Sequence, residues 1–187
     1  QIRKKGEAHI ISFFIDFVDG RFIPGAPALT EDAAAFLKEI LFQPLLEDGV
    51  FRADIVETEK RNLLDLLAAR SNEKTAYAVH RCGELMAQGQ PFEVCEYGTC
   101  EEIEKITPSS LFSFYKQALQ SAVFEIFAIG AFSQQRVASL MADAFAADRR
   151  PVQVQTSYIA RRGGVREYTE SFQVEQAKLS LGYRLDT

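Results

Sequence analysis

Apolar residues recur along the chain at two periods, which separate expected strands from expected helices. Residues 8–18 alternate with period two and carry large apolar groups on both faces, which predicts a central strand covered on both sides. Residues 30–43 have one apolar stripe at helical spacing. We expect Thr30 to cap this helix and Pro44 to end it.

Capping residues mark the starts of further helices. A long helix is expected from about Asp54, with Glu57 reaching back to form a capping box, until the polar residues 71–74 interrupt it before a helix at 75–86. Three later starts share a Ser or Thr cap before a helical pattern: the capping box Thr99 to Glu102, Thr107 followed by Pro108, and Ser133.

The remaining apolar runs have the length and alternation of strands. We expect a buried strand at 123–129 and three more at 152–158, 165–174 and 177–185, with the turn 161–164 as a domain linker. Helices layered on a mostly antiparallel sheet make the predicted fold α+β. Four strand aromatics are expected in the core: Phe13, Phe14, Phe17 and Phe124.

Composition and charge exclude several classes of protein. The 187 residues are 47% hydrophobic and 25% charged, enough apolar surface for a core, and the net charge of −5 disfavours a nucleic-acid partner. No apolar run approaches the roughly 20 residues of a membrane-spanning helix. Three cysteines without Cys-x-x-Cys spacing indicate reduced thiols and a cytoplasmic protein. The chain begins with Gln1 rather than Met, so we expect a fragment of a longer protein.

The residues themselves do not form a recognisable catalytic motif. The sequence has no Walker-type loop, no G-x-G-x-x-G and no G-x-S-x-G. Cys82 and His80 are two residues apart on an expected helix and face different ways. Zinc binding by Cys82, Cys95 and Cys100 with His80 or His9 lacks suitable spacing. The acids of the long helix, among them Glu57, Glu59 and Asp65, are typical of a solvated face.

Several segments in order resemble one peptidase family. The strongest is 56–67, Val-Glu-Thr-Glu-Lys-Arg followed by an apolar helix; the others are 41–44 (Leu-Phe-Gln-Pro), 97–98, 106–116 and 129–132. Together they resemble the M16 metallopeptidases, the insulinase and mitochondrial-processing-peptidase family. Residues 4–7 and 72–78 resemble a bacterial branch of it that lacks the zinc motif and pairs with a motif-bearing paralogue.

The resemblance implies a fold and a missing metal site. Active members bind zinc through H-x-x-E-H and a later acid; the motif would lie upstream of Gln1, and the third-ligand position falls on Leu66, or on Asp65 if the alignment slips by one. Leucine has no donor atom for zinc. Residues 1–160 would then form an M16-like domain lacking its N-terminal part, and 161–187 would open a second repeat.

These implications lead to three hypotheses. The first is a catalytically silent M16-like chain without zinc of its own. It would be a structural or peptide-holding subunit that partners an active zinc peptidase paralogue, or it would associate with a second copy of itself. Peptides would bind by adding a strand to a sheet edge. The second is a zinc-dependent endopeptidase whose ligand helix lies upstream and whose third ligand is Asp65 or Glu59. The third is an assembly module without peptide binding.

Overall fold

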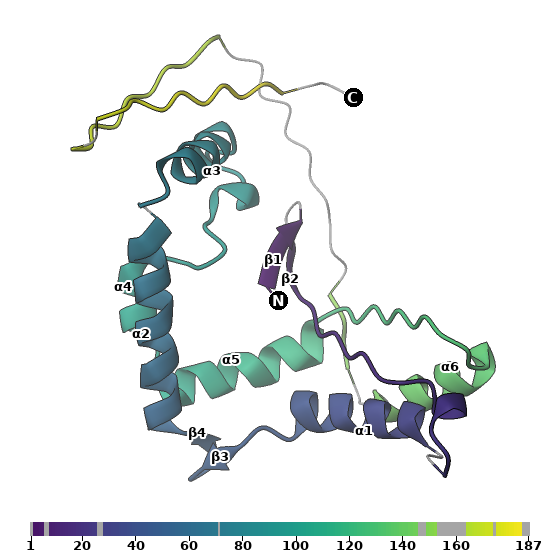
Figure 1. Ribbon diagram of the computed structural model, residues 1–187. Helices are drawn as coiled ribbons and strands as arrows, with labels where there is room; N and C mark the ends of the chain where they lie inside the picture. The colour runs from purple at the N-terminus through teal and green to yellow at the C-terminus, as the bar shows by residue number, and fades with distance from the viewer. Residues whose placement is uncertain are drawn as a thin grey trace. The chain divides into compact units, whose positions relative to one another are not determined.

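The structure, a computed structural model, describes residues 2–5, 8–25, 28–70, 72–145, 149–152, 164–173 and 175–184. The chain divides into two compact units. Unit 1 comprises Gln1–Ile11, Thr58–Lys105 and Val154–Thr187, and unit 2 comprises Ser12–Glu57 and Ile106–Gln153. Helix α2 (Ala53–Arg70) begins in unit 2 and ends in unit 1 (Figure 1).

Unit 1 contains one hairpin and a series of helices. Strands β1 (Ile2–Lys5) and β2 (Ala8–Ile11) pair in antiparallel fashion, and α2 is followed by α3 (Lys74–Met86), η2 (Pro91–Glu93) and α4 (Cys100–Glu104). The ammonium group of Lys4 donates to the carbonyl of Phe92 at 2.6 Å and to that of Val94, which fastens the hairpin to the η2 loop. Ala87 and Ile103 are 2% exposed and mark the core of this unit.

Unit 2 is built from three helices, α1 (Leu29–Phe42), α5 (Pro108–Ser121) and α6 (Gln134–Ala144). It also holds the short η1 (Gly20–Phe22) and a small antiparallel hairpin of β3 (Leu46–Glu47) and β4 (Val50–Phe51). Asp48 and Gly49 have positive φ angles, 51° and 79°, as a tight two-residue hairpin turn requires. Helix α1 packs on α6, and α5 packs on β4.

Aromatic side chains provide much of the packing in unit 2. Phe42, Phe124 and Phe145 meet edge to face with ring centroids 5.5–6.3 Å apart. A second cluster joins Phe51 of β4 to Tyr115 of α5, and the Tyr115 hydroxyl donates to the carbonyl of Leu41 at 2.5 Å. Half-burial of Phe124 agrees with its predicted place in the core.

The predicted helices are present, and their cap residues agree in three cases of five. Thr99 forms a capping box with Glu102 at the start of α4, Thr107 caps α5, and Ser133 caps α6 by accepting from the Arg136 amide. The predicted cap at Thr30 is wrong, because α1 begins after Ala28 and Thr30 lies within its first turn. Asp54 is also inside its helix, as the second residue of α2, where it pairs with Arg52 at 2.6 Å.

The prediction of a mostly antiparallel sheet is wrong, although α+β is correct. Within the described ranges, the only strands are the two hairpins, and helices account for more residues. The strand predicted at 8–18 ends at Ile11, and 123–129 is extended without strand pairing. Phe13, Phe14 and Phe17, expected in the core, are 48%, 72% and 44% exposed. Alternation favours an extended backbone, but a strand also needs a neighbour to pair with its backbone groups.

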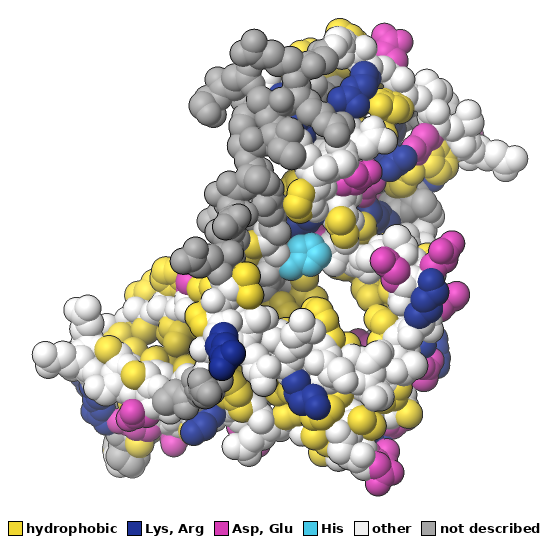
Figure 2. Space-filling model, turned by 180° about the vertical axis from the view of Figure 1, so that it is seen from behind, with side chains coloured by type: hydrophobic (Ala, Val, Ile, Leu, Met, Phe, Trp, Pro, Cys, Tyr) yellow, Lys and Arg dark blue, Asp and Glu magenta, His cyan; other side chains and the backbone are white. Residues whose placement is uncertain are grey.

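Large hydrophobic side chains are exposed on both units, as the yellow areas of Figure 2 show for one face. Within unit 2, Phe127 and Ile129 are 86% and 99% exposed. The predicted strand at 152–158 beyond Val152, the first three residues of the turn at 161–164, and the boundary at 160/161 lie outside the described residues. No helix in the described ranges is long and apolar enough to cross a bilayer.

Candidate functional site

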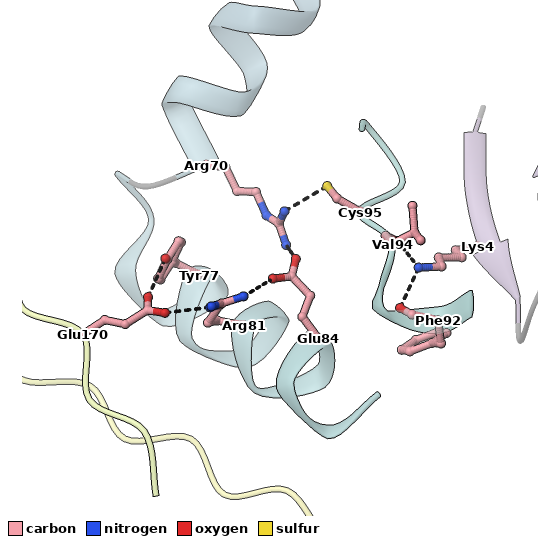
Figure 3. A network of polar contacts seen from close by, with 9 residues as sticks. All are labelled: Lys4, Arg70, Tyr77, Arg81, Glu84, Phe92, Val94, Cys95 and Glu170. Atoms are coloured by element: carbon pink, nitrogen blue, oxygen red, sulfur yellow. Dashed lines mark hydrogen bonds and ion pairs between the residues drawn. The ribbon is translucent and has the colours of Figure 1, made fainter. Parts of the chain in front are cut away.

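A network of charged side chains in unit 1 joins the end of α2 to α3. Arg70, the last residue of α2, donates to Glu84 of α3 at 2.8 Å, and Arg81 donates to the other oxygen of the same carboxylate at 3.2 Å. A further guanidinium nitrogen of Arg70 donates to the Cys95 Sγ at 3.1 Å. Figure 3 shows Arg70 reaching between Cys95 and Glu84. Glu84 therefore pairs with both arginines and joins the end of α2 to α3.

The network continues to an extended segment near the C-terminus. Glu170 accepts a hydrogen bond from the Tyr77 hydroxyl at 2.6 Å and one from Arg81 Nε at 2.7 Å (Figure 3). These two donors hold the pKa of the Glu170 carboxyl below its usual value. The same contact raises the pKa of Tyr77, because ionising its hydroxyl would place a second negative charge against the carboxylate.

Two further sets of contacts fasten this segment to α3. Phe172 meets the Tyr77 ring edge to face at 5.2 Å, and the Lys74 ammonium lies 4.4 Å from the centre of the Phe172 ring. Farther along, Arg184 donates to the carbonyl of Met86 and to the side chain of Gln90, the latter at 3.1 Å. Contacts with α3 are thus made at residues 170–172 and again at Arg184.

A cavity of about 310 Å³ adjoins the network. It is lined by Tyr77, Arg81, Glu84 and Glu170, together with residues from α2 and the loop before α4, among them Leu67, Arg70 and Cys95. Two arginines face two glutamates here, so the charges balance. The charged groups of the lining are paired with one another, which holds α3 against the end of α2 and against Glu170.

The residues predicted as metal ligands lie on α2 outside this network. Leu66 is 46% exposed, and Asp65 beside it is also exposed. Glu59, on the same helix face as Leu66, accepts from the Asn62 amide at 3.5 Å. Leu66, to which the family resemblance assigns the third-ligand position, has no donor atom to offer zinc. In the described ranges, no three His, Cys, Asp or Glu side chains gather closely enough to hold an ion.

The cysteines and histidines are likewise dispersed. Cys82, Cys95 and Cys100 are free thiols, as expected. His80 is exposed on α3, whereas Cys82 is half-buried and its thiol lies 4.0 Å from the Met86 sulfur. The predicted divergence of the His80 and Cys82 side chains agrees with this difference in exposure.

Comparison with known proteins gives the chain a relative. No family model matches it. Over 184 residues it is 26% identical to a protein from Bacillus subtilis (strain 168) named "Probable inactive metalloprotease YmfF", an alignment that covers 98% of the chain and 43% of that protein. The chain is a distant homologue of YmfF. This homology confirms the predicted resemblance to an M16-like metallopeptidase homologue, and the chain spans less than half the length of YmfF.

A solved structure supports the fold. A conserved protein from Enterococcus faecalis V583 superposes with a TM-score of 0.64 at 24% identity, over 75% of this chain and 33% of that one. At this identity the likeness concerns the fold alone.

Sequence reasoning did not find the Arg70–Glu84–Arg81–Glu170 network. The Arg81–Glu84 pair has the i, i+3 spacing of a helical ion pair and was visible in principle. Glu170 is 89 residues from Arg81, and nothing in its surroundings in the sequence marks it as a partner of α3.

Proposed function

We propose that this chain is part of a catalytically silent, M16 peptidase-like protein that gives structural support or holds peptide for an active zinc peptidase paralogue. The observation that carries the proposal is the homology to YmfF over 98% of the chain, since YmfF bears the name of an inactive metalloprotease. The proposal extends the catalytic inactivity in that name to this chain, and it adds an association with an active paralogue and the binding of peptide.

The chemistry of α2 supports the absence of catalysis. Zinc in a peptidase needs three protein ligands and an open position for the water that attacks the substrate. Leu66 occupies the position that the family resemblance assigns to the third ligand, and it cannot supply an electron pair. Asp65 would replace it only if the alignment were shifted by one residue.

Exposed apolar surface supports a partner. In unit 2, the extended residues 123–129 expose Val123, Ile126, Phe127 and Ile129 by 44–99%. Large exposed apolar areas of this kind mark surfaces that become buried on association. An extended segment without a strand partner can also accept a peptide strand through its backbone groups.

The metal test uses the full-length natural protein, with zinc measured by mass spectrometry and peptidase activity measured with and without a chelator. We expect no stoichiometric zinc and no chelator-sensitive cleavage. Asp65→Asn and Leu66→Ala are the matched variants, and we expect neither to change the zinc content. Stoichiometric zinc that Asp65→Asn removes, together with chelator-sensitive cleavage, would instead support the zinc endopeptidase.

The partner test mixes the full-length protein with an M16-type paralogue that carries H-x-x-E-H and follows sedimentation. We expect a complex that retains a labelled peptide longer than the paralogue does alone. A complex without peptide retention would support the assembly module instead, and sedimentation of the two proteins as separate species would contradict the proposed partnership.

A further inference from the structure

Residues 164–173 contact α3 through two side chains of fixed spacing, Glu170 and Phe172. Glu170 and Phe172 are two residues apart, so in an extended backbone both side chains project to the same side. Residues 164–173 have no helix or strand assignment and are all exposed. Among the described residues, no backbone-to-backbone hydrogen bond joins this segment to α3. The printed contacts of residues 164–173 with α3 are those of Glu170 and Phe172, and Arg184 makes a separate contact with the carbonyl of Met86.

Helix α3 presents a complementary face. Lys74, Tyr77 and Arg81 follow the spacing i, i+3, i+7, which places them in one row along the helix. Arg81 and the Tyr77 hydroxyl donate to the carboxylate, and the Tyr77 ring and the Lys74 ammonium contact the aromatic ring. Each half of the row therefore matches the chemistry of one ligand side chain.

We propose that Lys74, Tyr77 and Arg81 form a binding site for extended peptides that carry a carboxylate side chain two residues before an aromatic ring, and that Glu170 and Phe172 occupy it in this structure. This inference rests on the proposed peptide-holding function and names the site and the ligand class. The chain's own segment shows how such a ligand is held.

The surroundings define the specificity further. Arg81 also donates to Glu84, so one carboxylate is already part of the site. A single acid on the ligand gives Arg81 a second carboxylate partner, whereas a further acid near Arg81 would be repelled by Glu84 and by the first acid. The adjoining cavity of about 310 Å³, bordered by Glu170, is at the small end of ligand pockets and leaves room for a neighbouring ligand side chain.

The site is exchangeable because its occupant is tethered rather than built into a sheet. A tethered segment competes at an effective concentration in the millimolar range, which weakens binding of the same sequence added in solution. Removing the two anchoring side chains from the segment should therefore open the site to an added peptide.

The test uses the full-length natural protein and a fluorescein-labelled peptide of residues 165–173, Val-Arg-Glu-Tyr-Thr-Glu-Ser-Phe-Gln, followed by fluorescence anisotropy. We expect the peptide to bind the double variant Glu170→Gln/Phe172→Ala at least about tenfold more tightly than the wild type. In that double variant, Arg81→Ala should weaken binding about tenfold, while Arg61→Ala, which removes an exposed arginine of α2, should leave it unchanged.

Substitutions in the peptide give a second measurement that does not depend on how the variants fold. Replacing its Glu equivalent to Glu170 by Gln, or its Phe equivalent to Phe172 by Ala, should weaken binding about tenfold in each case. The proposal would be overturned if the labelled peptide bound the wild type and the double variant with equal affinity. It would also be overturned if neither Arg81→Ala nor either change in the peptide altered that affinity.

These outcomes are separate from those of the proposed function. A protein that holds zinc and cleaves peptide but still binds the labelled peptide through Arg81 would refute catalytic silence and leave the site in place. A zinc-free protein that assembles with the paralogue but does not bind the labelled peptide would refute the proposed peptide site and leave catalytic silence and the partnership in place.

Discussion

Gly182 offers a sharp test of how the C-terminal segment lies on α3. A Cβ atom built on Gly182 would overlap the Met86 sulfur and come within 3.0 Å of Cys82 Sγ. Ordinary contacts of a Cβ atom begin at 3.4 Å, so Gly182→Ala requires either Met86 or the segment to move. We expect this variant to loosen residues 177–184 from α3 while the rest of unit 1 stays folded.

The size of the effect follows from the cost of overpacking. Adding a methyl group to a packed core typically costs about 1–3 kcal/mol, and because Gly182 is exposed and the side chain of Met86 is flexible, we expect the low end, about 1 kcal/mol. If that cost falls on the closed position of the segment, the open population rises about fivefold, since each 1.4 kcal/mol corresponds to a factor of ten. The half-buried Cys82 thiol should then react with iodoacetamide faster by a similar factor.

Mass spectrometry of the alkylated peptides separates Cys82 from the exposed Cys100, which serves as an internal reference. The matched control is Gly83→Ala, because a Cβ at Gly83 meets no atom within 4 Å. That control should stabilise α3 by about 0.5–1 kcal/mol and leave the Cys82 rate unchanged or slower. An unchanged ratio of Cys82 to Cys100 reactivity in Gly182→Ala would show that Gly182 does not lie against α3.

Three further predictions concern unit 1. Thr99→Ala removes the capping box of α4 and should lower the free energy of unfolding by about 1 kcal/mol in urea, against less than about 0.5 for the exposed Ser109→Ala. Glu84→Gln should cost about 1–2 kcal/mol in the same assay, because the partly buried Arg70 loses its charged partner. The pKa of the Glu170 carboxyl is lowered in the folded protein, so its anchoring contact should be complete above the ordinary pKa of 4.5 and should be lost as the pH falls through the lowered pKa. NMR resonances of the Phe172 ring should report this loss, and the pH dependence should be absent in Glu170→Gln.

The helices could be predicted because their signals are local. Thr99, Thr107 and Ser133 each accept from an amide two or three residues later, so the sequence contains both partners of the bond. The prediction for Thr30 failed for a related reason: the acids after it suit any position in the first turn, and α1 begins two residues earlier than the capping pattern indicated.

The sheet could not be predicted because its partners are not local. Residues 12–18 and 123–129 are extended, as their alternation indicated, but the described part of the chain does not give them ladder partners. Alternation determines backbone shape, whereas membership of a sheet depends on a second strand that can come from anywhere. Phe13 and Phe127, which lie in these two stretches, are exposed among the described residues.

The candidate site shows the same limit in side-chain terms. Its ion pair within α3, Arg81 with Glu84, is encoded in a spacing of three residues, while the contacts that attach Glu170 connect positions 89 and 93 residues apart. A glutamate in an extended segment has no local feature that distinguishes an anchor from a solvated charge. Only its place beside Tyr77 makes that distinction.

Residues 177–184 show why an alternating pattern does not identify the buried face. Leu179, Leu181 and Tyr183 form the apolar row, and an inward-facing apolar row is the ordinary expectation. The structure has the reverse: these three are 69–84% exposed, while Ser180 and Arg184 are half-buried. Gly182 explains the reversal, because the absence of a side chain there lets the backbone approach Cys82 and Met86 more closely than an apolar row would allow. The pattern predicted an extended segment correctly, and one glycine determined which face lies on the helix.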